Sequence, residues 1–177
     1  MYNLKLQEMF DKQKTLQYRN YGVALPDHLP GNLPMQVTGV VAELGEVLAA
    51  NEAWKDWKKH PRAVDGSHLL DEVADLWHFI INLTLYSGYD ALNVDDVNDM
   101  FIHGNNLKDD IKHVPIAVHH LIQNIGAVLD TPRLIYIKQV WRSLVDLTIA
   151  LGYDFDVLYA AFIAKNKVNH IRQDNQY

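Results

Sequence analysis

Two pairs of carboxylates stand in otherwise apolar segments of the chain. Glu43 and Glu46 are the only charged residues of "VVAELGEVLAA", which begins at Val40, and Glu72 and Asp75 belong to "DEVADLW". Side chains three residues apart project from the same face of a helix, so each pair points one way. Unpaired carboxylates in an apolar setting are costly and call for cations. The four acids are therefore interpreted as a metal site.

The ligand atoms indicate which cation it binds. The chain contains no cysteine, and carboxylate oxygens suit Mg²⁺ or Mn²⁺, which often complete their shell with water and substrate phosphates. A ferritin-like di-iron site needs Glu-x-x-His on paired helices, whereas the fourth residue here is Glu46 in "ELGE" and Asp75 in "EVAD". We expect Mg²⁺, with Mn²⁺ as the alternative.

A tryptophan- and lysine-rich segment, "WKDWKK", follows the first acid pair. One interpretation is an amphipathic helix end with Trp54 and Trp57 packed inward. The other is a surface that stacks a base on a tryptophan and directs Lys55 and Lys58 at phosphates. The residues alone leave both open.

Two further polar stripes lie on expected helices. Lys165, Asn169 and Arg172 share one face of the last helix, where beside a metal the two cations can bind phosphate and the amide can recognise a base edge or sugar. His78 and Asn82 continue the stripe of the second acid pair. A hydrogen-bonded core histidine is an equal alternative for His78.

The elements that must position these residues are helices. Apolar residues recur at spacings of three and four, which predicts an all-α fold. Ser67 and Thr131 are expected as N-caps, Gly88 as a helix stop, and Val41 as part of the core stripe of the second helix. Helices are expected over residues 3–20, 35–57, 67–86, 116–129, 132–151 and 155–173, with shorter ones within 94–112.

The second half of the chain repeats the first. "PMQVTGVVAELGEVL" from Pro34 aligns without gaps with "PIAVHHLIQNIGAVL" from Pro115, a shift of 115 − 34 = 81. "LWHFIINLTLYSGYD" from Leu76 aligns with "VWRSLVDLTIALGYD" from Val140, a shift of 140 − 76 = 64. We therefore expect one domain, residues 1–177, that is a helical bundle built from a duplicated helix pair.

The repeat separates packing residues from functional ones. The four acids become Asn124, Ala127, Tyr136 and Gln139 in the second copy, while the apolar pattern is kept. A fold that needed the acids for stability should have retained some of them. The acids are therefore interpreted as functional.

Composition excludes several classes of partner. A formal charge of −6 argues against nucleic acid or an anionic membrane as the main partner. The sequence has no uninterrupted apolar run of membrane-spanning length and no signal-peptide pattern at its start. A cytoplasmic protein is expected.

Four blocks resemble a known family. "AELGE", "WKDWKK", "DEVADLWHFIINL" and "KNKVNHIRQDN", spread from Ala42 to Asn175, resemble the all-α nucleotide pyrophosphohydrolases that include the MazG-like proteins, and most closely the dimeric dUTPases. The E-x-x-E and E-x-x-D pairs are common to the group, whereas W-K-x-W-K and the terminal K-N-x-x-N-x-x-R-Q are typical of the dUTPase branch. The resemblance implies a homodimer that hydrolyses dUTP, and dUDP, to dUMP with Mg²⁺, releasing pyrophosphate from dUTP.

The resemblance also implies roles for individual residues. The four acids would hold the metals, and Glu46 would also orient or deprotonate the attacking water. Phosphates would be held by Lys165, Arg172 and one of Lys55 and Lys58. The base and deoxyribose would be contacted by His78, Phe79, Trp54 or Trp57, Gln13 or Gln17, and Asn169, with Asn82 beside them.

Two other functions remain as alternatives. One is the same hydrolysis of another nucleotide, such as dCTP or a broad set of dNTPs, because the acids read only metal and phosphate. The other is a non-catalytic, nucleotide-binding regulatory protein that kept the fold. Intact acids and cations in one half of the repeat argue against the second alternative.

Overall fold

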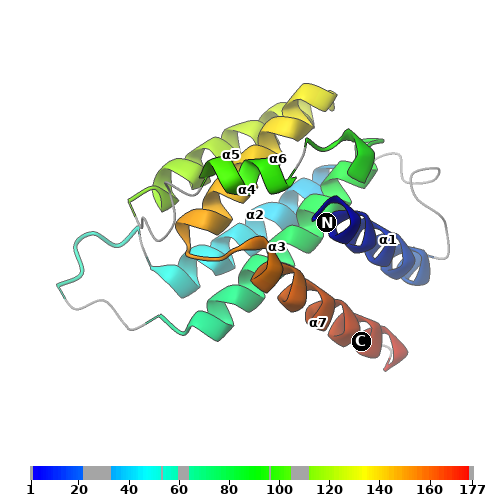
Figure 1. The fold of residues 1–177 in the computed structure, drawn as a ribbon, viewed down its shortest axis with the longest axis horizontal. Coiled ribbons are helices and arrows are strands. Elements are labelled where there is room, and N and C mark those ends of the chain that lie inside the picture. The colour runs from blue at the N-terminus through cyan, green and yellow to red at the C-terminus, as the bar shows by residue number, and fades with distance from the viewer. Residues whose placement is uncertain are drawn as a thin grey trace.

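The structure is a computed structural model that describes residues 2–21, 33–52, 54–59, 64–95, 97–104 and 112–175. Within these ranges it is helical and has no strand, so the predicted all-α class is confirmed (Figure 1). The elements are α1 (Tyr2–Tyr21), α2 (Leu33–Asn51), α3 (Gly66–Tyr86), the 3₁₀ turn η1 (Ala91–Asn93), α4 (Val97–Gly104), α5 (Val114–Asp130), α6 (Leu134–Ala150) and α7 (Phe155–Asp174).

The bundle consists of two helix pairs, against which α1, α4 and α7 pack. α2 lies against α3 and α5 against α6, while α7 packs on α3 with α1 beside it, and α4 packs on α6 (Figure 1). One cluster of buried apolar side chains extends through the bundle, and its largest fully buried members include Trp77, Trp141, Phe10 and Phe155. The helix that follows each pair, α4 or α7, thus packs on the other pair.

Two reciprocal hydrogen bonds join the pairs at the centre of this cluster. Trp77 Nε1 donates to Thr148 Oγ1 at 3.0 Å, and Trp141 Nε1 donates to Thr84 Oγ1 at 2.9 Å. The shift of 64 residues converts each bond into the other. Since the indole rings also meet edge to face, 5.4 Å apart, the repeated halves pack on each other as two copies related by an approximate two-fold axis.

The repeated "GYD" ends one helix and starts the next element in both halves. Gly88 and Gly152 have φ of 83° and 92°, in the left-handed region that favours glycine. The following carboxylates, Asp90 and Asp154, then cap η1 and α7 by accepting backbone N–H groups. Gly88 is therefore a helix stop, as predicted.

The predicted bounds of three helices were wrong. α2 ends at Asn51 rather than continuing to Trp57, because Glu52 adopts φ of 56°. The N-cap of α3 is Asp65 rather than Ser67, since the Asp65 carboxylate accepts the N–H of Ser67 and the N–H of the next residue. α6 starts at Leu134 after residue 133, so Thr131 is not its cap.

The prediction that Val41 belongs to the core stripe of α2 was also wrong. Val41 is 52% exposed rather than in the core. By length and mean hydropathy alone (19 residues, 1.2) α2 would be able to cross a membrane, although a core helix of a bundle passes the same test. In this structure α2 lies along α3 and carries two carboxylates.

The reciprocal bonds predict a specific loss of stability. Thr148→Val keeps the side-chain shape but leaves the Trp77 indole N–H buried without an acceptor, so we expect the free energy of unfolding to fall by about 1–3 kcal/mol. Urea unfolding followed by circular dichroism measures the change. Thr15→Val is the matched control, because that hydroxyl donates to a helical carbonyl but is exposed; equal unfolding midpoints for the two variants would contradict the prediction.

Candidate active site

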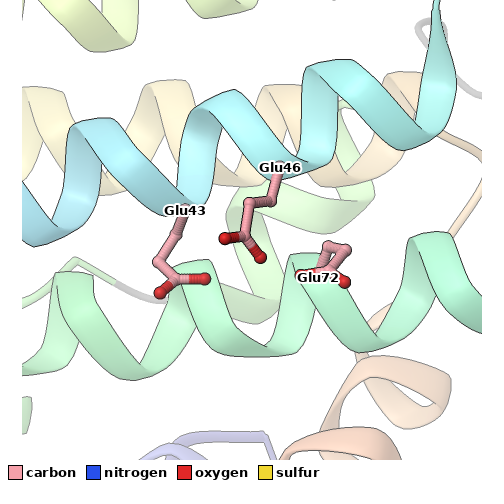
Figure 2. A group of neighbouring side chains, drawn as sticks. All are labelled: Glu43, Glu46 and Glu72. Atoms are coloured by element: carbon pink, nitrogen blue, oxygen red, sulfur yellow. The ribbon is translucent and has the colours of Figure 1, made fainter.

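Three carboxylates face one another between α2 and α3. Glu43 and Glu46 extend from α2 toward Glu72 on α3 (Figure 2), and one oxygen from each lies within 4.8 Å of the other two. Glu72 is buried, Glu43 half-buried and Glu46 exposed, so the group opens to solvent on the Glu46 side. This set of oxygen donors is one that suits Mg²⁺ or Mn²⁺.

The fourth predicted ligand, Asp75, lies one turn further along α3. Its Oδ2 atom is 2.6 Å from Lys165 Nζ of α7, and both side chains are more than four-fifths buried. Arg172 adds a second positive charge near the same carboxylate. The C-terminal helix therefore brings cations to the edge of the acidic group.

Burial and mutual repulsion shift the titration of these acids. Loss of solvent, followed by the charges of Asp75, Glu46 and Glu72, raises the pKa of Glu43 to about 7. The pKa of Glu72 is raised by burial and then by its hydrogen bond with Glu46. Burial also raises the pKa of Asp75, although Lys165 opposes the shift. A bound cation would favour the charged form of all these groups.

A cavity of about 260 Å³ adjoins the acids between α1, α2, α3 and α7. Glu43 and Asp75 belong to its wall. Its other side chains include many of those predicted to contact a substrate. From the predicted set these are Gln13 and Gln17 of α1, His78, Phe79 and Asn82 of α3, and Asn169 and Arg172 of α7.

A buried chain of amides forms part of this wall. Gln13 Nε2 donates to Asn82 Oδ1 at 2.8 Å, and Gln13 Oε1 lies 2.7 Å from His78 Nδ1, which donates to it. Burial lowers the pKa of His78 to about 3, so the imidazole is neutral. Its ring stacks on Phe162 with centroids 3.8 Å apart. His78 is thus a hydrogen-bonded core histidine that also faces the cavity.

A second amide in the wall keeps an unused acceptor. Gln17 is 6% exposed, and its Oε1 has no hydrogen-bond partner among the described residues. Buried polar atoms are normally paired. An acceptor held in this way in the wall of a cavity is suited to a ligand that donates an N–H or O–H.

A family model described as dUTPase matches residues 5–177. The chain belongs to the all-α dimeric dUTPase family. None of the curated proteins compared with the sequence matches it. Membership makes the chain an enzyme of the dUTP diphosphatase type and gives it a nucleotide substrate. Enzymes of this family are generally metal-dependent, in keeping with the acidic group.

None of the residues of the "WKDWKK" segment lines the cavity. Trp54 and Trp57 are exposed and contact each other edge to face at 5.3 Å, so the interpretation in which both tryptophans pack inward is wrong. Lys55 and Lys58 bind the carboxylate of Glu52 at 2.8 and 2.6 Å. These hydrogen bonds lower the pKa of Glu52 to about 2. Contact of the segment with substrate stays a prediction.

Sequence reasoning missed three other residues of this region. Leu16 and Gln173 line the cavity beside predicted neighbours, a position that helical spacing from Gln13 and Asn169 signals. Glu52 was missed because α2 was expected to run on, which would have placed its carboxylate elsewhere.

The second half shows what replaces an acid that is not needed. Asn124 stands at the position of Glu43 and donates to Gln139 O at 3.2 Å and to Ser143 Oγ at 3.0 Å. Neutral hydrogen bonds between α5 and α6 thus occupy a place where the first half keeps a charge. The contrast supports a functional role for the charge.

The raised pKa of Glu43 predicts a pH dependence of stability. Its folded-state pKa of about 7 exceeds the ordinary value of 4.5, so its stabilising contribution is complete below 4.5 and is lost as pH rises through 7. With chelator present, we expect the free energy of unfolding of wild type to fall over this range relative to Glu43→Gln. Urea unfolding from pH 4 to 8 measures both, and parallel profiles would rule the shift out.

Proposed function

We propose that this chain hydrolyses dUTP, and dUDP, to dUMP with Mg²⁺, releasing pyrophosphate from dUTP. The observation that carries the proposal is one cavity with carboxylates at one part of its wall and buried neutral amides at another. A nucleotide has the matching polarity, with a charged phosphate chain and a neutral base. Family membership supports the reaction; the metal, the diphosphate substrate and the mechanism are the proposed parts.

The residues present fit a divalent cation. Glu43, Glu46 and Glu72 offer three convergent oxygens, and burial followed by neighbouring carboxylates raises the pKa values of Glu43 and Glu72. These three residues would hold the metal, with Asp75 as a further ligand. When bound, Mg²⁺ would neutralise phosphate charge and make a coordinated water a better nucleophile. Mn²⁺ is the alternative with the same ligand preference.

The chain's own residues would position the phosphates and the water. Glu46 is the exposed member of the acidic group and would orient or deprotonate the attacking water as a general base. Lys165 and Arg172 would bind phosphate oxygens, and Lys165 already lies within 2.6 Å of a carboxylate of the site. Because no side chain needs to attack phosphorus, the proposal requires no covalent intermediate.

The amide part of the wall favours uracil over cytosine. Uracil presents an N–H donor at N3 between two carbonyl acceptors, whereas cytosine presents an acceptor at N3. Gln17 Oε1, which has no partner among the described residues, can accept the uracil N3–H, whereas at the same ring position cytosine presents a second acceptor. Asn169 of α7 lines the same cavity and would contact the base or deoxyribose. Hydrolysis of dCTP or of a broad dNTP set is the second candidate.

We also propose that the chain forms a homodimer through α2 and α5. α2 is strongly apolar, yet only 28% of its most apolar 18-residue window is buried. Met35 and Val41 on α2, and Ile116 and Ile122 on the adjoining α5, are half or more exposed. Exposed apolar side chains on two adjoining helices are a candidate interaction surface. The expected single domain and cytoplasmic location remain predictions beside it.

Nucleotide hydrolysis tests the proposed function. We expect purified protein with Mg²⁺ to convert dUTP to dUMP and pyrophosphate faster than dCTP, dTTP, dATP or dGTP, and to stop when metal is chelated. Glu46→Gln should lower turnover by at least ~10²-fold while the protein stays helical. Asp130→Asn, an exposed acid of the second half, is the control. Metal-dependent binding of dUTP without hydrolysis would instead support the regulatory alternative.

Light scattering tests the dimer. At micromolar concentration we expect twice the chain mass of 20.3 kDa, and Val41→Glu should shift the protein toward monomer because it places a charge in the apolar surface. A wild-type monomer that hydrolyses dUTP would overturn the dimer and leave the proposed reaction standing.

A further inference from the structure

Gly39 of α2 lies directly against the ring of Phe79 of α3. A Cβ atom built on Gly39 would be 2.2 Å from Phe79 Cε1 and 2.4 Å from Phe79 Cδ1. Carbon atoms pack at about 3.5–4.0 Å, so no other residue at this position is compatible with the ring where it stands. The place of the ring therefore depends on the absence of a side chain at Gly39.

The ring stands between the two chemically different parts of the cavity. Phe79 is four residues beyond Asp75 and three before Asn82 on α3, and all three line the cavity. At 1.5 Å rise per residue, the Cα atom of Phe79 is about 6 Å along the helix axis from that of Asp75 and about 4.5 Å from that of Asn82. Among the described residues that line the cavity, Phe79 supplies the phenyl ring.

We propose that Gly39 is a positioning residue for the base, which it controls through Phe79. This inference rests on the proposed function, because it takes the ligand to be a pyrimidine nucleotide. An aromatic face next to hydrogen-bonding amides can stack a base whose edge those amides read. A side chain at position 39 would displace the ring by about 1 Å or more and spoil that surface, while the acids stay in place.

The internal repeat supports a functional origin for the pair. With the shifts of 81 and 64, Gly39 corresponds to His120 and Phe79 to Ser143. The half without the acids thus has a large residue on its first helix and a small one on its second. The combination of glycine and phenylalanine occurs only in the half that carries the acids.

The low helix propensity of glycine also supports a functional origin for Gly39. Gly39 lies inside α2 with helix on both sides, where glycine is unfavourable relative to alanine. If the site did not need the ring, Gly39→Ala would simply strengthen the helix. Gly126 on α5 has no atom within 4 Å of a built Cβ, so Gly126→Ala reports that effect alone.

Steady-state kinetics on the full chain with dUTP and Mg²⁺ test the proposal. We expect Gly39→Ala to raise KM roughly tenfold or more with kcat within about twofold, since it removes binding common to ground and transition states. Calorimetric affinity for inorganic pyrophosphate with Mg²⁺ should be unchanged. Gly126→Ala should match wild type in both measurements. A Gly39→Ala enzyme with wild-type KM would overturn the role of Gly39 alone, whereas a wild type inactive on dUTP would overturn the proposed function and this inference together.

A double mutant shows whether the effect passes through the ring. Phe79→Ala should raise KM, and adding Gly39→Ala to it should change KM no further, because the clash is gone. The same background should restore any loss of melting temperature that Gly39→Ala causes alone. A further rise in KM, or a fall in melting temperature, that Gly39→Ala still causes in the Phe79→Ala background would show that Gly39 acts by another route and would overturn the proposal.

Discussion

The crossed indole–hydroxyl bonds at the centre of the bundle are the constraint on which the other features depend. Trp77 and Trp141 each bind a threonine of the opposite helix pair, and both are fully buried among apolar side chains. Because these bonds fix how the two pairs pack on each other, α4 is placed against the α5–α6 pair and α7 against the α2–α3 pair. That is how α7, which follows α6, comes to lie on α3 and to bring Lys165 to Asp75.

The candidate site combines an unfavourable group of charges with a neutral wall. Three carboxylates share a small space, and burial together with repulsion makes Glu43 reluctant to ionise. A few residues away His78 is neutral and every polar contact of Gln13 with it and with Asn82 is uncharged. In the proposed function, the same short segment of α3 would serve both phosphate chemistry and base recognition, with Phe79 between them.

The sequence predicted the helices and the acidic group because both follow local rules. Apolar spacing marks helices, and i, i+3 spacing places Glu72 and Asp75 on one face. The sequence-based predictions were wrong where the backbone conformation of one residue, or a contact between distant segments, determines the structure. The left-handed conformation of Glu52 ends α2 early, Asp65 outcompetes Ser67 as a cap, and exposure of Val41 depends on which neighbours α2 has. The closeness of Gly39 and Phe79 joins two helices and has no signal in either one alone.

The fusion of the two helix pairs has a consequence for how the site is assembled. Lys165, Asn169 and Arg172 belong to the half of the chain that has lost its acids, and they reach the acids of the other half through α7. If the two halves were separate proteins, the half that carries Lys165 and Arg172 would have to bind the half that carries the acids, and the fraction bound would depend on the concentration of both. Tethering turns that encounter into an intramolecular one with a high effective concentration. Every copy of the acidic group then comes with its own α7, and the second half can evolve as a carrier of α7 rather than as a catalyst.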